Sequence, residues 1–229
     1  MTRKLTILLI AIAAATLCNA QNIKAFVTSG ATLSQIDGDE VYGFKKFGYV
    51  GSVGALIPLE SKERWLVSLE AMFSQRGARE ERSYNSYHYK VTLPYIEIPV
   101  MAHFADPKGG WTFGVGFSYS RLMGTPKETF HYDTTGFIPD TKAPFIKNDF
   151  AVIADIRFKI WRGLKFNVRY QYSLAPIKKD WDFQIRSSRG DEFNEHWTRN
   201  AYNNSLSARL IWVFGDNAGT TYKQKNKRR

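Results

Sequence analysis

The sequence has little cysteine, few acidic residues and no long apolar run beyond its first twenty residues. Cys18 is the single cysteine, so a chain without its N-terminal segment has no disulfide and no cysteine-based metal site. No later stretch reaches the ~18 to 20 apolar residues of a spanning helix, and a mean hydropathy of −0.34 argues against a helical membrane bundle. Since 44% of the 229 residues are hydrophobic, wholesale disorder is excluded.

The first twenty residues have the composition of a secretory signal peptide. Arg3 and Lys4 give a positive start, a thirteen-residue run of apolar residues and threonines follows, and small residues lead to Ala20. We predict a signal peptide over residues 1–20, cleaved after Ala20, and an exported protein. Lipid attachment to Cys18 is the alternative, although Leu17 stands where a small residue is needed.

Past this segment the hydrophobic pattern has a period of two, which predicts β-strands. In residues 164–174, Phe166, Val168 and Tyr170 share one face with other apolar residues, while polar residues occupy the other face. Each segment reaches the ~9 to 11 residues of a tilted membrane strand. The pattern predicts eight strands, at residues 23–34, 46–58, 65–76, 90–104, 111–119, 149–161, 164–174 and 205–214.

The connections between these segments alternate in length. Short connections fall near residues 59–63, 105–110 and 162–163, and long ones at 35–45, 77–89, 123–148 and 176–201. This alternation is typical of outer-membrane barrels. We therefore predict, for residues 21–215, an all-β, eight-stranded antiparallel up-and-down transmembrane β-barrel in the cell outer membrane, with short periplasmic turns and long extracellular loops. A soluble all-β sandwich would also alternate and is the alternative.

Four tryptophans fall where a lipid interface is expected. Trp65 and Trp111 open strands at the short-turn end, while Trp161 and Trp212 close strands at that same end. Tryptophan prefers the headgroup level of a membrane, so these four residues are predicted interface aromatics.

The polar faces of the strands carry charges that must point into the barrel. Eight strands enclose a lumen that side chains fill, and buried charges must be paired. The predicted polar network of the lumen is Glu70, Glu97, Asp155, Arg157, Arg169 and Arg209, with Lys159 and Lys165 also inward. A tight turn pairing Ile160 with Leu164 would set Asp155 opposite Arg169. A plugged lumen is favoured over an ion path, and because inward bases outnumber acids, any leak is expected to favour anions.

Three stretches resemble the PorT-like outer-membrane barrel family. They are Ser34–Asp39 after the first strand, Tyr95–Pro99 in the fourth and Tyr202–Leu206 opening the last. The resemblance runs from about residue 23 to 214 and implies a small Gram-negative, porin-like barrel of the cell envelope. The namesake of the family is an accessory of a protein secretion system, so the resemblance implies that role as an alternative function.

The sequence shows no clear catalytic or metal-binding pattern. His88, His131 and His196 fall in predicted loops and His103 near a strand end, without metal-ligand spacing. The acidic stretch 37–40 is too short for a calcium loop and is expected to be a solvated turn with Gly38 at a strained position. No catalytic residue, metal or cofactor is predicted, and an enzyme is not expected.

The segment 176–201 is the most distinctive external surface. It carries five charges of each sign interleaved with Trp181, Phe183, Phe193 and Trp197, a mixture that suggests a self-packed loop or a protein-binding surface and not a one-signed nucleic-acid groove. These four aromatic residues form a candidate partner loop, with residues 123–148 as a second candidate.

The last fourteen residues, 216–229, form a basic tail that is predicted to lie in the periplasm. Its five cations oppose only Asp216, so it could contact anionic headgroups or an acidic partner. The sequence thus leaves two function classes open: a non-catalytic structural or interaction barrel, and a secretion accessory. Expected partners are outer-membrane lipid, lipopolysaccharide and an envelope protein, but not nucleic acid; the oligomeric state is unknown.

Overall fold

The computed structural model describes residues 23–39, 43–60, 62–80, 88–106, 110–131, 136–139, 144–186 and 193–215. Within these ranges, side chains are described except at 88–89, 130–131, 136–139, 183–186 and 193–197. The predicted signal peptide and the basic tail lie outside the described residues. Among the residues described, no helix is long and apolar enough to cross a membrane.

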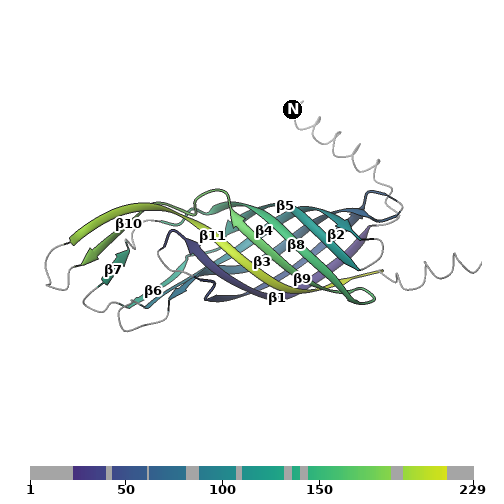
Figure 1. The fold of residues 1–229 in the computed structure, drawn as a ribbon, viewed down its shortest axis with the longest axis horizontal. Coiled ribbons are helices and arrows are strands. Elements are labelled where there is room, and N and C mark those ends of the chain that lie inside the picture. Colours follow the sequence, from purple (N-terminus) through teal and green to yellow (C-terminus); the bar gives the residue numbers. More distant parts are fainter. Residues whose placement is uncertain are drawn as a thin grey trace, which may run out of the picture.

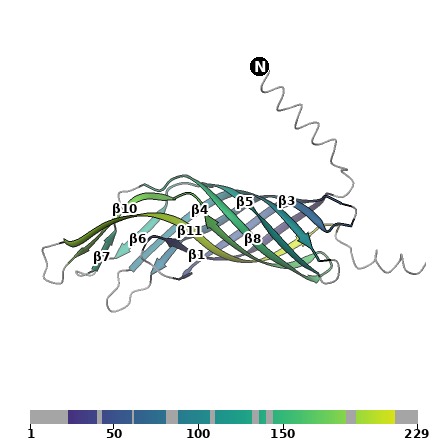
Figure 2. The same ribbon diagram turned by 45° about the horizontal axis from the view of Figure 1, so that its top comes forward.

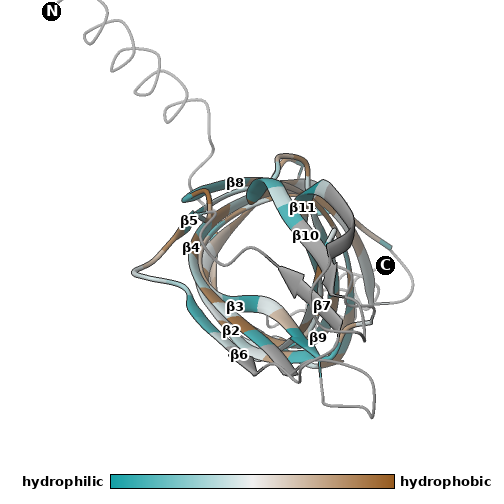
Figure 3. Ribbon diagram, turned by 90° about the vertical axis from the view of Figure 1, so that its left-hand side faces the viewer, coloured by the Kyte–Doolittle hydropathy of each residue, from teal (hydrophilic) through white to brown (hydrophobic). Residues whose placement is uncertain are grey.

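Eight antiparallel strands close into a barrel, as predicted (Figure 1). The ring closes because the first and last barrel strands pair along their length, from Phe26 opposite Val213 to Asp37 opposite Tyr202. The end view in Figure 3 shows this closed ring, which leaves no unpaired strand edge facing lipid. The barrel strands are β1 (Lys24–Asp37), β2 (Lys46–Pro58), β3 (Trp65–Glu80), β4 (His88–Ala105), β5 (Trp111–Leu122), β8 (Asn148–Trp161), β9 (Leu164–Ser173) and β11 (Phe193–Val213).

The segments expected as long loops contain further strands, which corrects the sequence prediction. These are β6 (Lys127–His131), β7 (Gly136–Pro139) and β10 (Lys178–Arg186). β6 pairs with β4, and β10 lies between β7 and the first part of β11. Figures 1 and 2 show these strands projecting beyond one end of the barrel. The lipid-facing apolar alternation stops at the membrane, so it could not reveal strands that continue past it.

The two faces of each barrel strand differ as the alternation predicts. Val115 and Phe117 are 64% and 66% exposed on the outer face, whereas their neighbours Ser118 and Ser120 are buried. At the barrel end opposite β6, β7 and β10, short turns connect the strands and contain backbone hydrogen bonds such as Leu59 N–H to the Trp65 carbonyl. The apolar residues therefore face lipid and the polar residues fill the interior.

The β8–β9 turn is tighter than expected. Asp155 lies opposite Arg169, as predicted, but Trp161 and not Ile160 pairs with Leu164, because a bulge shifts the register after Lys159. Arg162 takes a positive φ of 44° in this turn. A bulge absorbs one extra residue, so the prediction was right for the charge pair and wrong at the turn itself.

Candidate functional site: the charged lumen and the extracellular sheet

Glu70 is the centre of a charged layer in the half of the lumen nearest the short turns. Its carboxylate accepts hydrogen bonds from Arg169 at 2.6 Å and from Arg209 at 3.2 Å, and lies 3.8 Å from Arg157. Asp155 bridges the same three arginines, at 3.1 Å to Arg169, 3.3 Å to Arg157 and 3.7 Å to Arg209. We call these five residues the lower layer. All five are at most 4% exposed. The distances between them show that five of the six predicted network residues meet here.

Beside the lower layer, Ser68, His103 and Asp155 stand in the order of a hydrolase triad. Ser68 Oγ lies 2.8 Å from His103 Nε2, and His103 Nδ1 lies 3.6 Å from Asp155. However, the Arg157 guanidinium is 3.0 Å from the same Nε2. One ring nitrogen has one lone pair, so Arg157 competes with the proton transfer that Ser68 would need. The arrangement therefore reads as a structural contact of the lumen, in which the 3.6 Å between His103 Nδ1 and Asp155 Oδ1 is too long for a hydrogen bond.

Gly114 makes room for this contact. A Cβ at this position would lie 2.2 Å from His103 Nδ1 and 2.5 Å from Asp155 Oδ1. His103, Gly114 and Asp155 occupy one cross-strand row of β4, β5 and β8. The glycine is thus required by the packing of the lower layer.

A second charged layer lies toward the extracellular end of the lumen. In this layer carboxylates outnumber arginines, whereas in the lower layer arginines outnumber carboxylates. Arg76 forms ion pairs with Glu97 and, at 3.3 Å, with Asp149. Neutral groups complete the coordination: Ser74, Ser118 and Gln171 donate to Glu97, while Ser173 and Asn203 donate to Asp149. We call Arg76, Glu97 and Asp149 the upper layer. Met72, Met101, Ala151 and Ile153 are buried between the two layers.

The two layers together balance, which corrects the expected excess of bases. Among the described residues, the ion-paired core contains four carboxylates and four guanidiniums, because Asp149 and Arg76 join the six predicted residues. Lys159 is exposed at the barrel end and Lys165 only half-buried. The same alternation finds both residues: Asp149 lies three inward positions before Asp155 on β8, and Arg76 lies three inward positions after Glu70 on β3.

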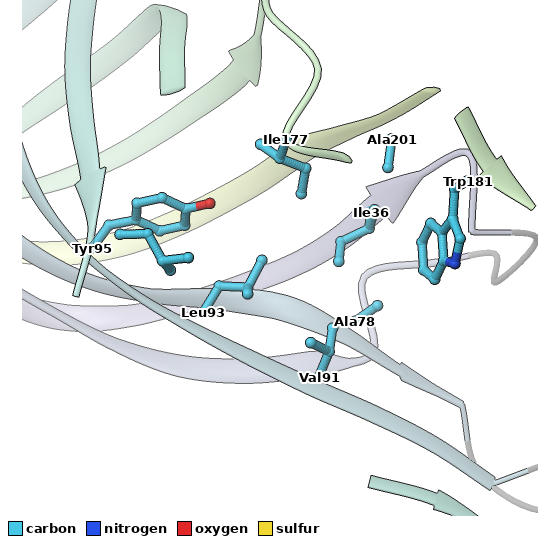
Figure 4. Close-up of a cluster of buried hydrophobic side chains, with 9 residues drawn as sticks. Ile36, Ala78, Val91, Leu93, Tyr95, Ile177, Trp181 and Ala201 are labelled. Atoms are coloured by element: carbon cyan, nitrogen blue, oxygen red, sulfur yellow. The ribbon is translucent and has the colours of Figure 1, made fainter. Parts of the chain in front are cut away.

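Apolar clusters close both ends of the charged core. At the short-turn end, Phe26, Leu56, Ile211 and Val213 pack together. At the other end, side chains from several strands converge, as Figure 4 shows. This upper cluster comprises Ile36, Ala78, Val91, Leu93, Tyr95, Leu122, Ile177, Trp181 and Ala201. The lumen is thus layered along its axis as apolar, charged, charged and apolar.

Trp181 belongs to this upper cluster and is 1% exposed, so it is not available as a partner contact. Lys178 lies beneath it, 4.2 Å from the Trp181 ring and 4.8 Å from the Phe145 ring. The Ile177 N–H donates to the Ala201 carbonyl of the neighbouring strand β11. The pattern of 176–201 could not reveal that Ile177, Lys178 and Trp181 are buried here. The backbones of Phe183 and Trp197 lie opposite each other, and that of Phe193 lies opposite Arg186, but these aromatic side chains lie outside the described ones.

The four predicted interface tryptophans lie together at the short-turn end of the outer surface. The ring centres of Trp161 and Trp212 lie 6.5 Å apart with the planes tilted by 54°. Trp65 packs on Phe104 at 5.0 Å and Trp111 on Phe158 at 4.2 Å. All four are between 38% and 55% exposed.

A second aromatic belt, which sequence reasoning did not single out, lies about ten residues further along the strands. It contains Phe47, Tyr49, Tyr119, Phe150, Tyr172 and Tyr202. Two belts separated by apolar strand faces mark the two levels of a membrane. The sequence does contain a pattern that predicts this second belt: most strands have an aromatic residue near their extracellular end.

Other candidate sites give a mixed result. β6 brings the backbone of His88 opposite that of His131, although their side chains, like that of His196, lie outside the described ones. Among the described residues, no group of three or more His, Cys, Asp or Glu could hold a metal ion. Gly38 has a φ of 100°, which confirms the strained turn position. Asp39 is only 1% exposed, so the expectation of a solvated turn was wrong there; Glu40 lies outside the described residues.

The closed barrel, its apolar outer face between two aromatic belts and its charged interior define a transmembrane β-barrel of the outer-membrane class. Residues 19–179 match the family described as outer membrane protein beta-barrel domain, and the chain belongs to this family. Membership implies the outer membrane as its location. It also implies that the short turns face the periplasm and the β6–β7–β10 end faces outward.

Three solved structures are similar to the chain. Neisserial surface protein A has 10% identity and a TM-score of 0.44, covering 85% of this chain and 100% of that one. The attachment invasion locus protein Ail of Yersinia pestis was solved with the heparin analogue sucrose octasulfate. It has 11% identity and a TM-score of 0.41, and the match covers 84% of this chain and 100% of that one. OprG from Pseudomonas aeruginosa has 12% identity and a TM-score of 0.40, and the match covers 83% of this chain and 96% of that one. No curated protein sequence matches the chain.

Proposed function

We propose that this protein is a sealed, non-catalytic anchor that presents a β-sheet to partners outside the outer membrane. The observation that carries the proposal is the layered lumen. Four buried arginines are matched by four buried carboxylates between two apolar clusters. Opening an aqueous path would require these pairs to separate in a low-dielectric interior, which costs several kcal/mol for each charge, on the order of 3 to 5.

The sealed lumen is tested by single-channel recording in planar bilayers. The intact protein is expected to give no large, stable conductance. Arg169→Gln combined with Trp181→Ala, which removes one charge from the lower layer and the largest side chain of the upper cluster, is the opened comparison. A large and stable conductance from the intact protein would contradict the proposal.

The proposed contact surface is the extracellular sheet, which consists of β7, β10 and the first part of β11. Phe183, Phe193 and Trp197 are its candidate anchors. Lipopolysaccharide and an envelope protein are the partner classes that fit its mixed charges. A photoreactive residue in place of Phe183 should cross-link to a partner in intact cells. The same residue in place of lipid-facing Val115, which is 64% exposed, is the matched control. Equal protein cross-linking at both positions would count against the sheet.

The resemblance to PorT-like barrels supports an alternative, in which the protein assists a secretion system. A deletion strain should then lose exported proteins broadly and retain their precursors in the periplasm. An unchanged set of secreted proteins would remove this alternative and leave the anchor.

A further inference from the structure

The upper layer of the lumen carries more negative charge than its arginine balances. Glu97 and Asp149 supply two carboxylates, and Arg76 supplies one guanidinium. Among the described residues, no other cation forms an ion pair with either carboxylate. Both carboxylate side chains are 0% exposed, and a buried charge is costly unless it is paired. The layer therefore calls for one more positive charge.

The surplus arginine of the lower layer lies too far away to supply that charge to Asp149. On β8, Asp149 and Asp155 are six residues apart, which is about 20 Å along a strand. The buried side chains of Met72 and Met101 lie between the two layers. Because Coulomb attraction falls with distance, the compensating charge must lie within the upper layer itself.

Oxygen atoms without hydrogen-bond partners mark where such a charge would sit. Asp149 Oδ2 accepts hydrogen bonds from Arg76, Ser173 and Asn203, whereas its Oδ1 has no partner in the described part of the chain. The same is true of the Ser120 hydroxyl and of Asn203 Oδ1, in side chains that are 0% and 1% exposed. Buried polar atoms are rarely left unpaired, so these three oxygens point to a group that they share.

The strand register places Ser120 between the two carboxylates. Ser120 of β5 lies directly opposite Glu97 of β4 and directly opposite Asp149 of β8. Opposed side chains in a sheet are close neighbours, yet the Ser120 hydroxyl forms a hydrogen bond with neither carboxylate. A proton shared by two oxygens requires hydrogen-bond distance. A cation with oxygen ligands at about 2.4 Å, in contrast, bridges oxygens that are further apart.

We propose that the upper layer binds one monovalent metal cation such as Na⁺, held by Asp149 Oδ1, the Ser120 hydroxyl and Asn203 Oδ1. Oxygen atoms are the ligands of hard cations. A single positive charge makes the layer neutral, whereas a divalent ion would leave it positive. The set has one carboxylate and two neutral oxygens, so it differs from a cluster of three or more His, Cys, Asp or Glu, which the described residues lack. The cation enters as the barrel folds, since apolar clusters close both ends of the lumen.

The test compares urea unfolding of the full-length protein in phosphatidylcholine vesicles in different salts. Sodium chloride, potassium chloride and N-methyl-D-glucammonium chloride are used at equal ionic strength, and each sample is refolded in its own salt so that the cation can enter. An ion that binds only the folded state raises the folding equilibrium constant with its concentration, by up to about tenfold for a tenfold increase in the ion. We expect this rise in sodium or potassium and none in the organic cation.

Two variants and a control locate the effect. Asp149→Asn removes the excess charge and should abolish the dependence on the metal cation, whereas Ser120→Ala removes one ligand and should weaken it. Ser207→Ala is the matched control, because Ser207 is also a lumen serine, 7% exposed, whose hydroxyl donates to the Arg169 carbonyl. This variant should keep the full dependence.

Two outcomes would overturn the proposal. Equal stability in all three salts would show that no metal cation binds, and would assign the compensating charge to a proton. A metal effect that persists undiminished in Asp149→Asn and Ser120→Ala would place the cation elsewhere on the protein. Heat-modifiable gel mobility confirms that each variant is folded, and if Asp149→Asn does not fold, Ser120→Ala alone must reduce the effect.

Discussion

The two charged layers of the lumen both compensate buried charges, but with opposite ratios of arginine to carboxylate. In the lower layer, three arginines share two carboxylates, Glu70 and Asp155. In the upper layer, Arg76 serves Glu97 and Asp149, and serine, glutamine and asparagine side chains supply the remaining donors. A carboxylate can be satisfied by neutral donors, whereas a guanidinium needs acceptors for five N–H groups. The lower layer therefore depends more on each of its charges.

The largest effect is expected from Glu70→Gln. This change keeps the shape of the side chain but leaves three buried guanidiniums with Asp155 as their only carboxylate, and breaking a buried pair from one side costs about 3 to 5 kcal/mol. The free energy of unfolding is measured by urea titration in lipid vesicles, with folded protein scored by gel mobility. Glu60→Gln, on an exposed turn residue, should leave it unchanged. A Glu70→Gln variant as stable as the intact protein would remove the basis of the comparison.

A smaller loss is expected from Arg76→Gln in the upper layer. Glu97 and Asp149 keep their serine, glutamine and asparagine donors, so we expect a loss of about 2 to 3 kcal/mol. The same urea titration measures both variants side by side. If Arg76→Gln costs more than Glu70→Gln, the two layers do not differ in the way proposed here.

The lower layer also depends on the space that Gly114 leaves. Gly114→Ala would push a methyl group into His103 and Asp155, at an expected cost of about 1 to 3 kcal/mol for overpacking. Gly51→Ala is the control, because a Cβ there would meet only the Thr28 carbonyl at 3.6 Å. Thermal midpoints of the two variants in the same detergent should separate them. Equal midpoints would mean that the row through His103 can relax.

These layers also show how far the sequence predicts the molecule. Alternation of apolar and polar residues identified all eight barrel strands and which face of each points inward, because a membrane imposes that period of two on every strand. It could not predict that Glu70 of β3 meets Arg169 of β9 and Arg209 of β11, since such contacts cross the lumen and depend on the stagger of the closed ring. Strands beyond the membrane were missed because no lipid face marks them there.

Glu128 of β6, above both layers, gives the smallest and most local effect. Burial raises the pKa of its carboxyl above the ordinary value, against a smaller opposing effect of Lys178. The folded protein therefore binds a proton more tightly than the unfolded chain, so this contribution to stability is fully present below about pH 4.3, the ordinary value. It is lost as the pH rises through the raised folded value of the pKa.

Amide hydrogen exchange of residues 127–131, corrected for its intrinsic pH dependence, should show β6 better protected at the lower pH. Glu128→Gln should abolish this difference, whereas Glu60→Gln should preserve it. Protection that does not change with pH in the intact protein would mean that β6 is held by its backbone pairing with β4 alone.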